Sequence, residues 1–167
     1  MSAVEVSPAS VAAGTCAVRR ATAGDRPALE RMLARCTGQT RYRRFHGPVK
    51  VFPERYLTEA LSGSPLHFAL VATAEGDGAV VALASCRAVD EGVAELGILV
   101  EDEWQRRGVG SYLLQEIVAY AGRTGLRALR AQVLAEQPWI VGLLRRHGSC
   151  MTAGAGQALH VTLSLPR

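Results

Sequence analysis

The sequence predicts an α/β fold with a single mixed sheet and helices on both faces. Three observations support this. Runs rich in Val, Leu and Ala at 67–73, 79–87 and 93–100 follow one another through turn sequences, which is typical of antiparallel strands. A helix is expected over 108–124, because its apolar residues fall at helical spacing, and another apolar run follows at 128–134. A strand, a crossover helix and a strand normally place the two strands parallel, so the sheet should be mixed.

Shorter elements are expected elsewhere in the chain. Thr22 with Asp25 resembles a capping box, which would start a helix through Leu33. The basic stretch that follows, up to Val49, is expected to be irregular. The other expected elements are a first strand at 17–19, a helix at 53–61, a short helix from Pro138 ended by Gly148, and a closing strand at 158–165.

Length and composition limit the classes of protein. The 167 residues fit one domain, with residues 16–167 folded and residues 1–15 forming a flexible tail. The formal net charge of +4 suits an anionic ligand but is too small to argue for nucleic acid. Four cysteines without a CxxC pair and four scattered histidines predict a reduced, cytoplasmic protein without a metal. No apolar run approaches the length of a membrane span.

Residues 93–110, VAELGILVEDEWQRRGVG, are the most informative segment. An apolar run containing Glu95 leads through a polar turn into the basic, glycine-bearing start of the long helix. The N–H groups of such a turn and the positive end of the helix dipole suit phosphate oxygens, and arginines can pair with them as a fork. A Walker loop is excluded because the only lysine is Lys50, and a dinucleotide fingerprint because Leu113 stands at the third glycine position.

Gln-x-x-Gly-x-Gly after an apolar strand with a glutamate resembles the acyl-CoA pyrophosphate signature of the GNAT superfamily of N-acetyltransferases. A second match at 136–148 resembles that family's Glu-Asn…Leu-x-x-x-Gly-Phe segment, with Gln137 at the asparagine position and Ser149 where phenylalanine is common. The basic segment 41–48, RYRRFHGP, is similar to a stretch in the bacterial protein-lysine acetyltransferase branch. The resemblance covers most of residues 17–165 and implies a GNAT-like single domain.

The resemblance also implies a site for acetyl-CoA as cosubstrate. The pantetheine arm would pair with the main chain of the strand at 93–100, as an added strand where it splays from the strand at 128–134. Gln137 would line the arm from the other side. The arm would contact Ile98, Leu99 and Val100, and the pyrophosphate would contact Gln105, Arg106, Arg107, Gly108, Val109, Gly110 and Ser111.

A primary amine needs a base before it can attack a thioester, because its ordinary pKa of about 10.4 keeps it protonated at neutral pH. Glu95 is the candidate, since loss of water within an apolar strand would make it a stronger base, and several GNAT branches carry the catalytic glutamate at the similar position. The alternative is a glutamate at the sheet rim that pairs with an arginine or faces solvent. Many family members use a tyrosine as general acid, but aligned on Gly148 that position is Leu144 here.

Three functions compete. The leading one is an N-acetyltransferase that moves acetyl from acetyl-CoA to a primary amine by direct attack in a ternary complex. Protein lysine is slightly favoured over a small amine, because the basic segment 41–48 argues against polycationic acceptors. The second is a non-catalytic acyl-CoA-binding sensor, which would not need Glu95. The third, nucleic-acid binding through the arginines and aromatic residues of 41–45, has thin support. A homodimer and the acyl chain length are left open.

Overall fold

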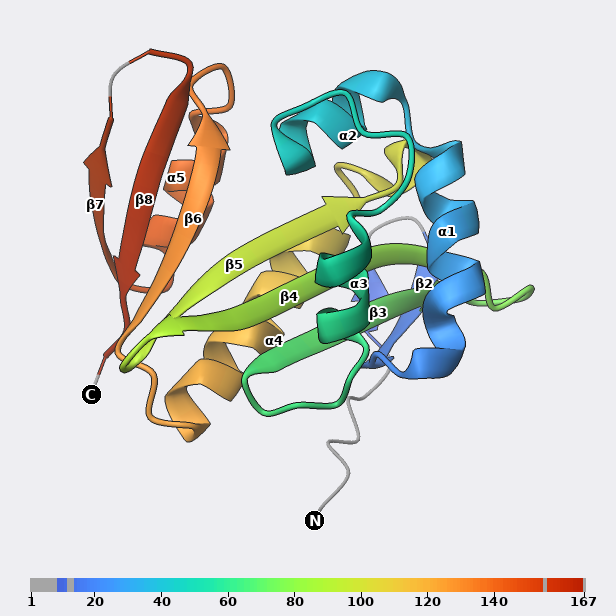
Figure 1. The fold of residues 1–167 in the computed structure, drawn as a ribbon, viewed down its shortest axis with the longest axis horizontal. Helices are drawn as coiled ribbons and strands as arrows, with labels where there is room; N and C mark the ends of the chain where they lie inside the picture. Colours follow the sequence, from blue (N-terminus) through green and yellow to red (C-terminus); the bar gives the residue numbers. More distant parts are fainter. Residues whose placement is uncertain (1–8, 12–13, 155, 167) are drawn as a thin grey trace.

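The computed structural model describes residues 9–11, 14–154 and 156–166. Its strands form one eight-stranded sheet within these ranges, in the order β1-β2-β3-β4-β5-β6-β8-β7 (Figure 1). Only β5 and β6 are parallel among the neighbouring strands described, which confirms the predicted mixed α/β sheet. The strands are β1 (Ala9–Val11), β2 (Gly14–Arg20), β3 (His67–Ala74), β4 (Val80–Asp90), β5 (Val93–Val100), β6 (Ala128–Leu134), β7 (Ser149–Ala153) and β8 (Ala158–Ser164).

Helices cover both faces of the sheet, as predicted. In Figure 1, α1, α2 and α3 lie in front of the sheet, whereas α4 and α5 lie behind it. Among the described residues, no helix is both long and apolar enough to cross a membrane. The helices are η1 (Ala23–Asp25), α1 (Arg26–Arg35), α2 (Gly38–Phe45), α3 (Glu54–Ala60), η2 (Asp102–Trp104), α4 (Val109–Arg123) and α5 (Trp139–Arg145).

The sheet separates two apolar clusters. Successive side chains of a strand point to opposite faces, so Leu70 of β3 packs in the cluster under α4 while Val71 packs in the cluster under α1 and α3. Burial on both faces explains why β3 and β4 read as nearly continuous apolar runs. The helices contribute their predicted apolar stripes, which are Leu113, Leu114 and Ile117 from α4 and Leu29, Met32 and Leu33 from α1.

The parallel pair β5 and β6 is short. Its register runs over Val93↔Ala128, Ala94↔Leu129 and Glu95↔Arg130, and beyond this point the two strands diverge (Figure 1). This confirms the splayed strands that the family resemblance implies. On the other side of β5, the register with β4 continues to Ala82↔Val100. One edge of β5 is therefore open over residues 96–100, where a ligand can approach its main chain.

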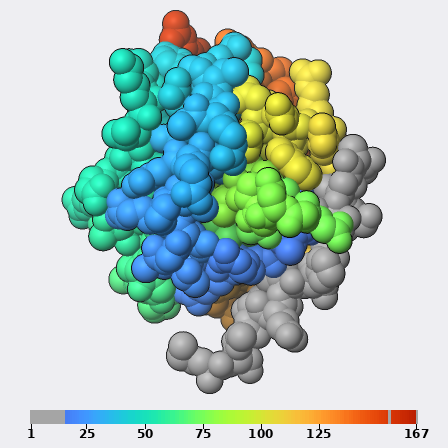
Figure 2. Space-filling model, turned by 90° about the vertical axis from the view of Figure 1, so that its right-hand side faces the viewer, coloured from blue at the N-terminus to red at the C-terminus, as the bar shows by residue number. Residues whose placement is uncertain are grey.

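The end of α1 is tied to the strand ends beside this opening. Arg35 donates from Nε and Nη2 to the Glu101 carboxylate at 2.9 and 3.0 Å, and from Nη2 to the Val80 carbonyl at 2.9 Å. In Figure 2, the β3–β4 turn (green) accordingly lies beside α1 (blue) and the residues after β5 (yellow). Glu101 is buried, so these contacts fix where the turn into α4 begins.

Three elements differ from the sequence prediction. The segment expected to be irregular contains α2, and that expectation is wrong. β7 follows Gly148, where no element was expected. Within the predicted tail of residues 1–15, β1 pairs with β2, while residues 1–8, 12 and 13 lie outside the described residues.

Candidate active site

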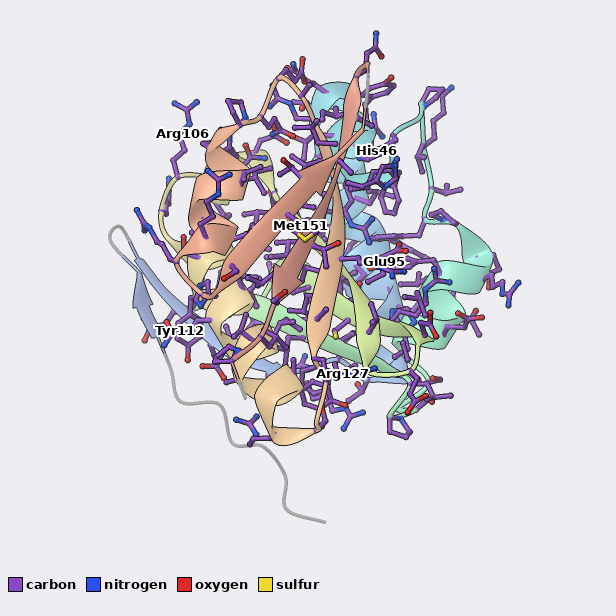
Figure 3. The ribbon with its side chains drawn as sticks, turned by 90° about the vertical axis from the view of Figure 1, so that its left-hand side faces the viewer. His46, Glu95, Arg106, Tyr112, Arg127 and Met151 are labelled. Carbon is purple, nitrogen blue, oxygen red and sulfur yellow. The ribbon has the colours of Figure 1, made fainter. Side chains whose placement is uncertain are left out.

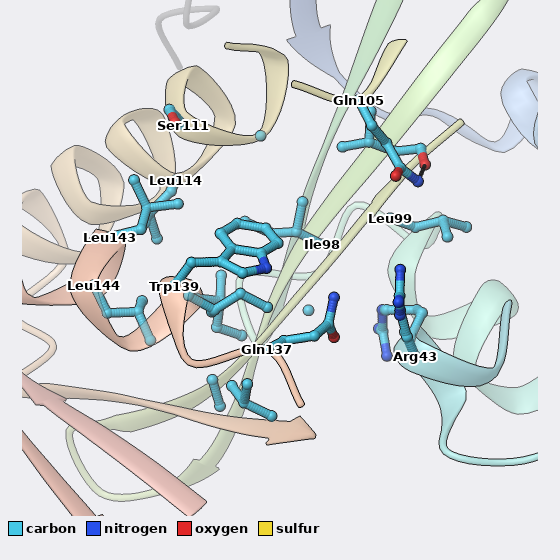
Figure 4. Close-up of a pocket in the computed structure, with 18 of the residues that line it drawn as sticks. Arg43, Ile98, Leu99, Gln105, Ser111, Leu114, Gln137, Trp139, Leu143 and Leu144 are labelled. Atoms are coloured by element: carbon cyan, nitrogen blue, oxygen red, sulfur yellow. Dashed lines mark hydrogen bonds between the residues drawn. The ribbon is translucent and has the colours of Figure 1, made fainter. Parts of the chain in front are cut away.

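A cavity of about 670 Å³ opens where β5 and β6 diverge. One wall is β5 with the turn that follows it, and the opposite wall is formed by β6 and the start of α5. Figure 4 shows the Trp139 ring lying across the opening, with Ile98 on one side and Gln137 on the other. Arg43 of α2 closes one side through its Nε, which lies 3.3 Å from the Glu136 carboxylate.

Most residues that the sequence assigns to an acyl-CoA site lie together here. Arg107 and Val109 are the two that do not line the cavity. Arg107 lies over the Trp104 ring, 5.3 Å from its centroid, and Val109 is buried in the core under α4. The nine that do line the cavity are Ile98, Leu99, Val100, Gln105, Arg106, Gly108, Gly110, Ser111 and Gln137.

The turn before α4 presents the helix N-terminus to the cavity. Gly108 has φ 88°, a left-handed conformation that favours glycine, and this allows the sharp entry into α4. The first N–H groups of a helix have no partner within the helix, so they can bind an anion together with the helix dipole. The Arg106 side chain extends away from the body of the protein in Figure 3, where it can meet a phosphate from the solvent side.

Gln105 links this turn to α2. Its Nε2 donates to the Val100 carbonyl at 3.0 Å and to Thr40 Oγ1 at 3.1 Å. Thr40 Oγ1 in turn donates to Asp102 at 2.8 Å, and the N–H and hydroxyl of Thr37 donate to the same carboxylate at 2.9 Å each. Burial would raise the pKa of Asp102, but these hydrogen bonds outweigh it, so the pKa is lowered. The carboxylate is therefore held charged at the start of α2.

A second pocket of about 280 Å³ meets the cavity at Gly97 and Arg44, which line both. Glu95 lies in this second pocket, with its carboxylate 3.6 Å from Arg87 Nη2. Its side chain is 57% exposed, so the expected burial of Glu95 is wrong. Strand alternation explains this, because buried Ala94 faces the core and Glu95 faces the other way. Figure 3 places Glu95 and Arg106 on opposite sides of the wing formed by β6, β8 and β7.

The floor of the second pocket is a polar cluster that the sequence does not reveal. Tyr56 of α3 lies with its hydroxyl 2.9 Å from Ser85 Oγ of β4. His67 lies behind Tyr56, with ring centroids 5.6 Å apart, and neither of its ring nitrogens has a hydrogen-bond partner among the described residues. Burial lowers the pKa of His67, which keeps the imidazole neutral. These three residues come from elements far apart in sequence, and no local pattern joins them.

The position expected for a general acid carries no proton donor. Leu144 lines the cavity and is 2% exposed. The described residues also contain no group of three or more His, Cys, Asp or Glu placed to hold a metal ion. The groups available near the junction of the two cavities are the Glu95 carboxylate, the main-chain N–H groups of β5, the arginines around them, and the hydroxyls of Tyr56 and Ser85.

Comparison with known proteins agrees with this geometry. The family model described as "Acetyltransferase (GNAT) family" matches residues 29–148. Acetyltransferase Pat from Mycolicibacterium smegmatis is 34% identical over 119 residues, which are 68% of this chain and 34% of that protein. The chain spans about a third of the length of the curated relatives it matches.

Two solved structures are similar in fold. The GNAT domain of PAT from S. lividans matches with a TM-score of 0.85 and 22% identity, covering 99% of each chain. A mutant of the cAMP-binding acyltransferase from Mycobacterium smegmatis matches with a TM-score of 0.64 and 26% identity. That match covers 96% of this chain and 47% of the other.

Proposed function

Because this chain belongs to the acetyltransferase (GNAT) family, we propose that it transfers an acetyl group from acetyl-CoA to a primary amine. The observation that carries the proposal is the pair of cavities that meet at Gly97. One of them runs beside an open strand edge to a helix N-terminus, and the other contains a carboxylate. This arrangement separates a place for the thioester from a place for the acceptor. It suits direct attack within a ternary complex.

The larger cavity suits acetyl-CoA. The open edge of β5 over residues 96–100 offers N–H and C=O groups that can pair with the amides of the pantetheine arm. Apolar side chains such as Ile98 and Leu143 line its length, with Gln137 on the opposite wall. The turn at 105–111 and the start of α4 would hold the pyrophosphate. The thioester would then lie near Gly97, where the two cavities join.

The second pocket suits the acceptor amine. Glu95 would take a proton from the ammonium, directly or through a water that its exposed position admits. The neutral nitrogen then attacks the thioester carbonyl carbon. The C–S bond breaks as CoA leaves as a thiolate, and the nitrogen loses its second proton to that thiolate or to water, which gives the neutral amide. A main-chain N–H near Leu99 would donate to the oxyanion of the tetrahedral intermediate. With leucine at position 144, the thiolate leaves without a dedicated acid.

For the acceptor, we favour a lysine of a protein over a small polycationic amine. Three arginines line the second pocket, Arg44, Arg55 and Arg87, against two carboxylates, Glu59 and Glu95. A compound with several ammonium groups would meet net repulsion there. A non-catalytic acyl-CoA sensor is the second candidate, and the ion pair between exposed Glu95 and Arg87 favours it, because it engages the carboxylate that an enzyme would need as its base.

The test is calorimetric titration with acetyl-CoA, followed by thiol release with a panel of amines and lysine peptides. Glu95→Gln should lower turnover by roughly a hundredfold while leaving acetyl-CoA affinity unchanged. Glu91→Gln, which removes the same charge from the exposed turn after β4, is the matched control and should behave as wild type. Equal turnover of Glu95→Gln at every pH would remove Glu95 as the base. Binding without thiol release would support the sensor, and no binding would refute the cavity assignment.

A further inference from the structure

Arg44 occupies the junction between the two cavities. It projects from α2 and its guanidinium lies over Gly97 of β5, so close that a Cβ added at position 97 would collide with it. Arg44 and Gly97 are also the two residues that line both cavities. If the thioester and the amine meet where these cavities join, as the proposed function requires, Arg44 lies next to the reacting nitrogen.

Two aromatic rings hold the Arg44 guanidinium. Its central carbon lies 4.7 Å from the ring centroid of Phe45 and 5.0 Å from that of Tyr56. Contacts with ring faces fix the plane of a guanidinium and exclude water from it, but they leave its N–H groups unused. The side chain is therefore oriented before any acceptor binds.

Its N–H groups are available to a ligand. The other arginines of the second pocket have carboxylate partners, since Arg55 Nε lies 2.8 Å from Glu59 and Arg87 Nη2 lies 3.6 Å from Glu95. Arg44 has no ion-pair or hydrogen-bond partner within the part of the chain that the structure describes. A fixed guanidinium with unused donors, inside a pocket that must admit an ammonium group, calls for an anion supplied by the substrate.

Resting on the proposed function, we propose that Arg44 selects acceptors that carry a carboxylate close to the reacting amine. A carboxylate matches the planar fork of a guanidinium and accepts two parallel hydrogen bonds from it. It also offsets the repulsion between Arg44 and the incoming ammonium, whose proton Glu95 of the same pocket would accept. The carboxylate can belong to a free amino acid or to an acidic residue beside a lysine in a polypeptide.

Matched acceptor pairs test this. One pair is lysine and lysinamide, which differ in the free carboxylate. The other is a lysine peptide with blocked ends and flanking glutamates, together with its glutamine counterpart. Wild type should prefer the carboxylate member of at least one pair by about tenfold in kcat/KM, the value expected from one charge-assisted contact. The pair that shows the preference identifies the source of the carboxylate.

Three variants and one control assign the preference to Arg44. Arg44→Gln should abolish the preference for the carboxylate acceptor, mainly by raising the KM of that acceptor. Arg44→Lys should keep part of the preference, because an ammonium group keeps the charge but cannot donate two parallel hydrogen bonds. Arg31→Gln removes an equal charge from the exposed face of α1 and should keep the preference. Gly97→Ala keeps Arg44 but displaces its guanidinium, so it should also lose the preference, and melting curves will show whether each variant is folded.

Two outcomes overturn the inference alone. These are equal kcat/KM for both members of each pair in wild type, and an undiminished preference in folded Arg44→Gln. A complete absence of transfer to every acceptor would overturn the proposed function and this inference with it. The same set of kcat/KM measurements therefore distinguishes a failure of this inference from a failure of the proposed function.

Discussion

Thr40→Val tests the network that joins α2 to the turn before α4. Thr40 is 7% exposed, and its hydroxyl donates to Asp102 at 2.8 Å and accepts from Gln105 at 3.1 Å. Valine keeps the shape and removes only the hydroxyl, while Asp102 retains its contacts with Thr37. A hydrogen bond to a charged group contributes about 1.5–3 kcal/mol, so we expect the free energy of unfolding to fall by about 2 kcal/mol.

For a domain of this size, about 2 kcal/mol corresponds to a melting temperature roughly 4–8 °C lower. Calorimetry and urea unfolding measure the loss. Acetyl-CoA affinity should fall as well, because Gln105 loses one of the two acceptors that hold the turn. Thr152→Val on exposed β7 is the matched control and should stay within about 0.5 kcal/mol of wild type. Equal stability of Thr40→Val and wild type would refute the role assigned to the network.

Three further predictions concern other parts of the molecule. The pKa of Asp25 is lowered chiefly by the hydrogen bonds that it accepts from Arg19 at 2.7 and 2.8 Å. The pair therefore stabilises the fold fully above the ordinary aspartate pKa of about 3.9, and this stabilisation is lost as the pH falls through the lowered pKa of Asp25. Urea unfolding should show that the free energy of unfolding of the wild type falls at acidic pH, and that it falls less in Asp25→Asn. The same dependence of the free energy of unfolding on pH in both proteins would contradict this prediction. Trp139→Ala should weaken acetyl-CoA binding by about tenfold with little change in melting temperature, because Trp139 is 64% exposed. Unchanged affinity in calorimetry would exclude a role for Trp139 in binding. Gly108→Ala should cost about 1–2 kcal/mol through the left-handed φ, whereas Gly122→Ala, in open space within α4, should stabilise; the opposite order in thermal unfolding would refute this.

Elements fixed by their own residues could be predicted from the sequence. Leu113, Leu114 and Ile117 mark the buried face of α4 by spacing alone, and the parallel pairing of β5 with β6 follows from the crossover helix between them. These two features depend on periodicity and on chain connection, both of which are visible in the sequence. The divergence of the two strands and the place of residues 105–111 beside the cavity were implied by the family resemblance, and within this turn Arg107 and Val109 do not line the cavity.

The rest depends on contacts between distant residues. Helix α2 has no apolar stripe, and its first turn is anchored by Asp102, a residue more than sixty positions from Thr37 and Thr40. The exposure of Glu95 could not be derived from its apolar neighbours, because they do not tell which face of β5 meets the core. The junction at Arg44 likewise requires α2 to lie over Gly97, which no local pattern states.

The brief β5–β6 register also has a thermodynamic consequence. Three residue pairs join these strands, and the main chain further along that edge of β5 is left for a ligand to pair with. A ligand that pairs with this edge binds the folded chain and not the unfolded one. The free energy of unfolding therefore rises with the ligand concentration. By mass action, a ligand at a hundred times its Kd adds about 2.7 kcal/mol to the stability of the folded state. If acyl-CoA is the ligand of this edge, as proposed, the melting temperature of this domain will report the acyl-CoA concentration around it.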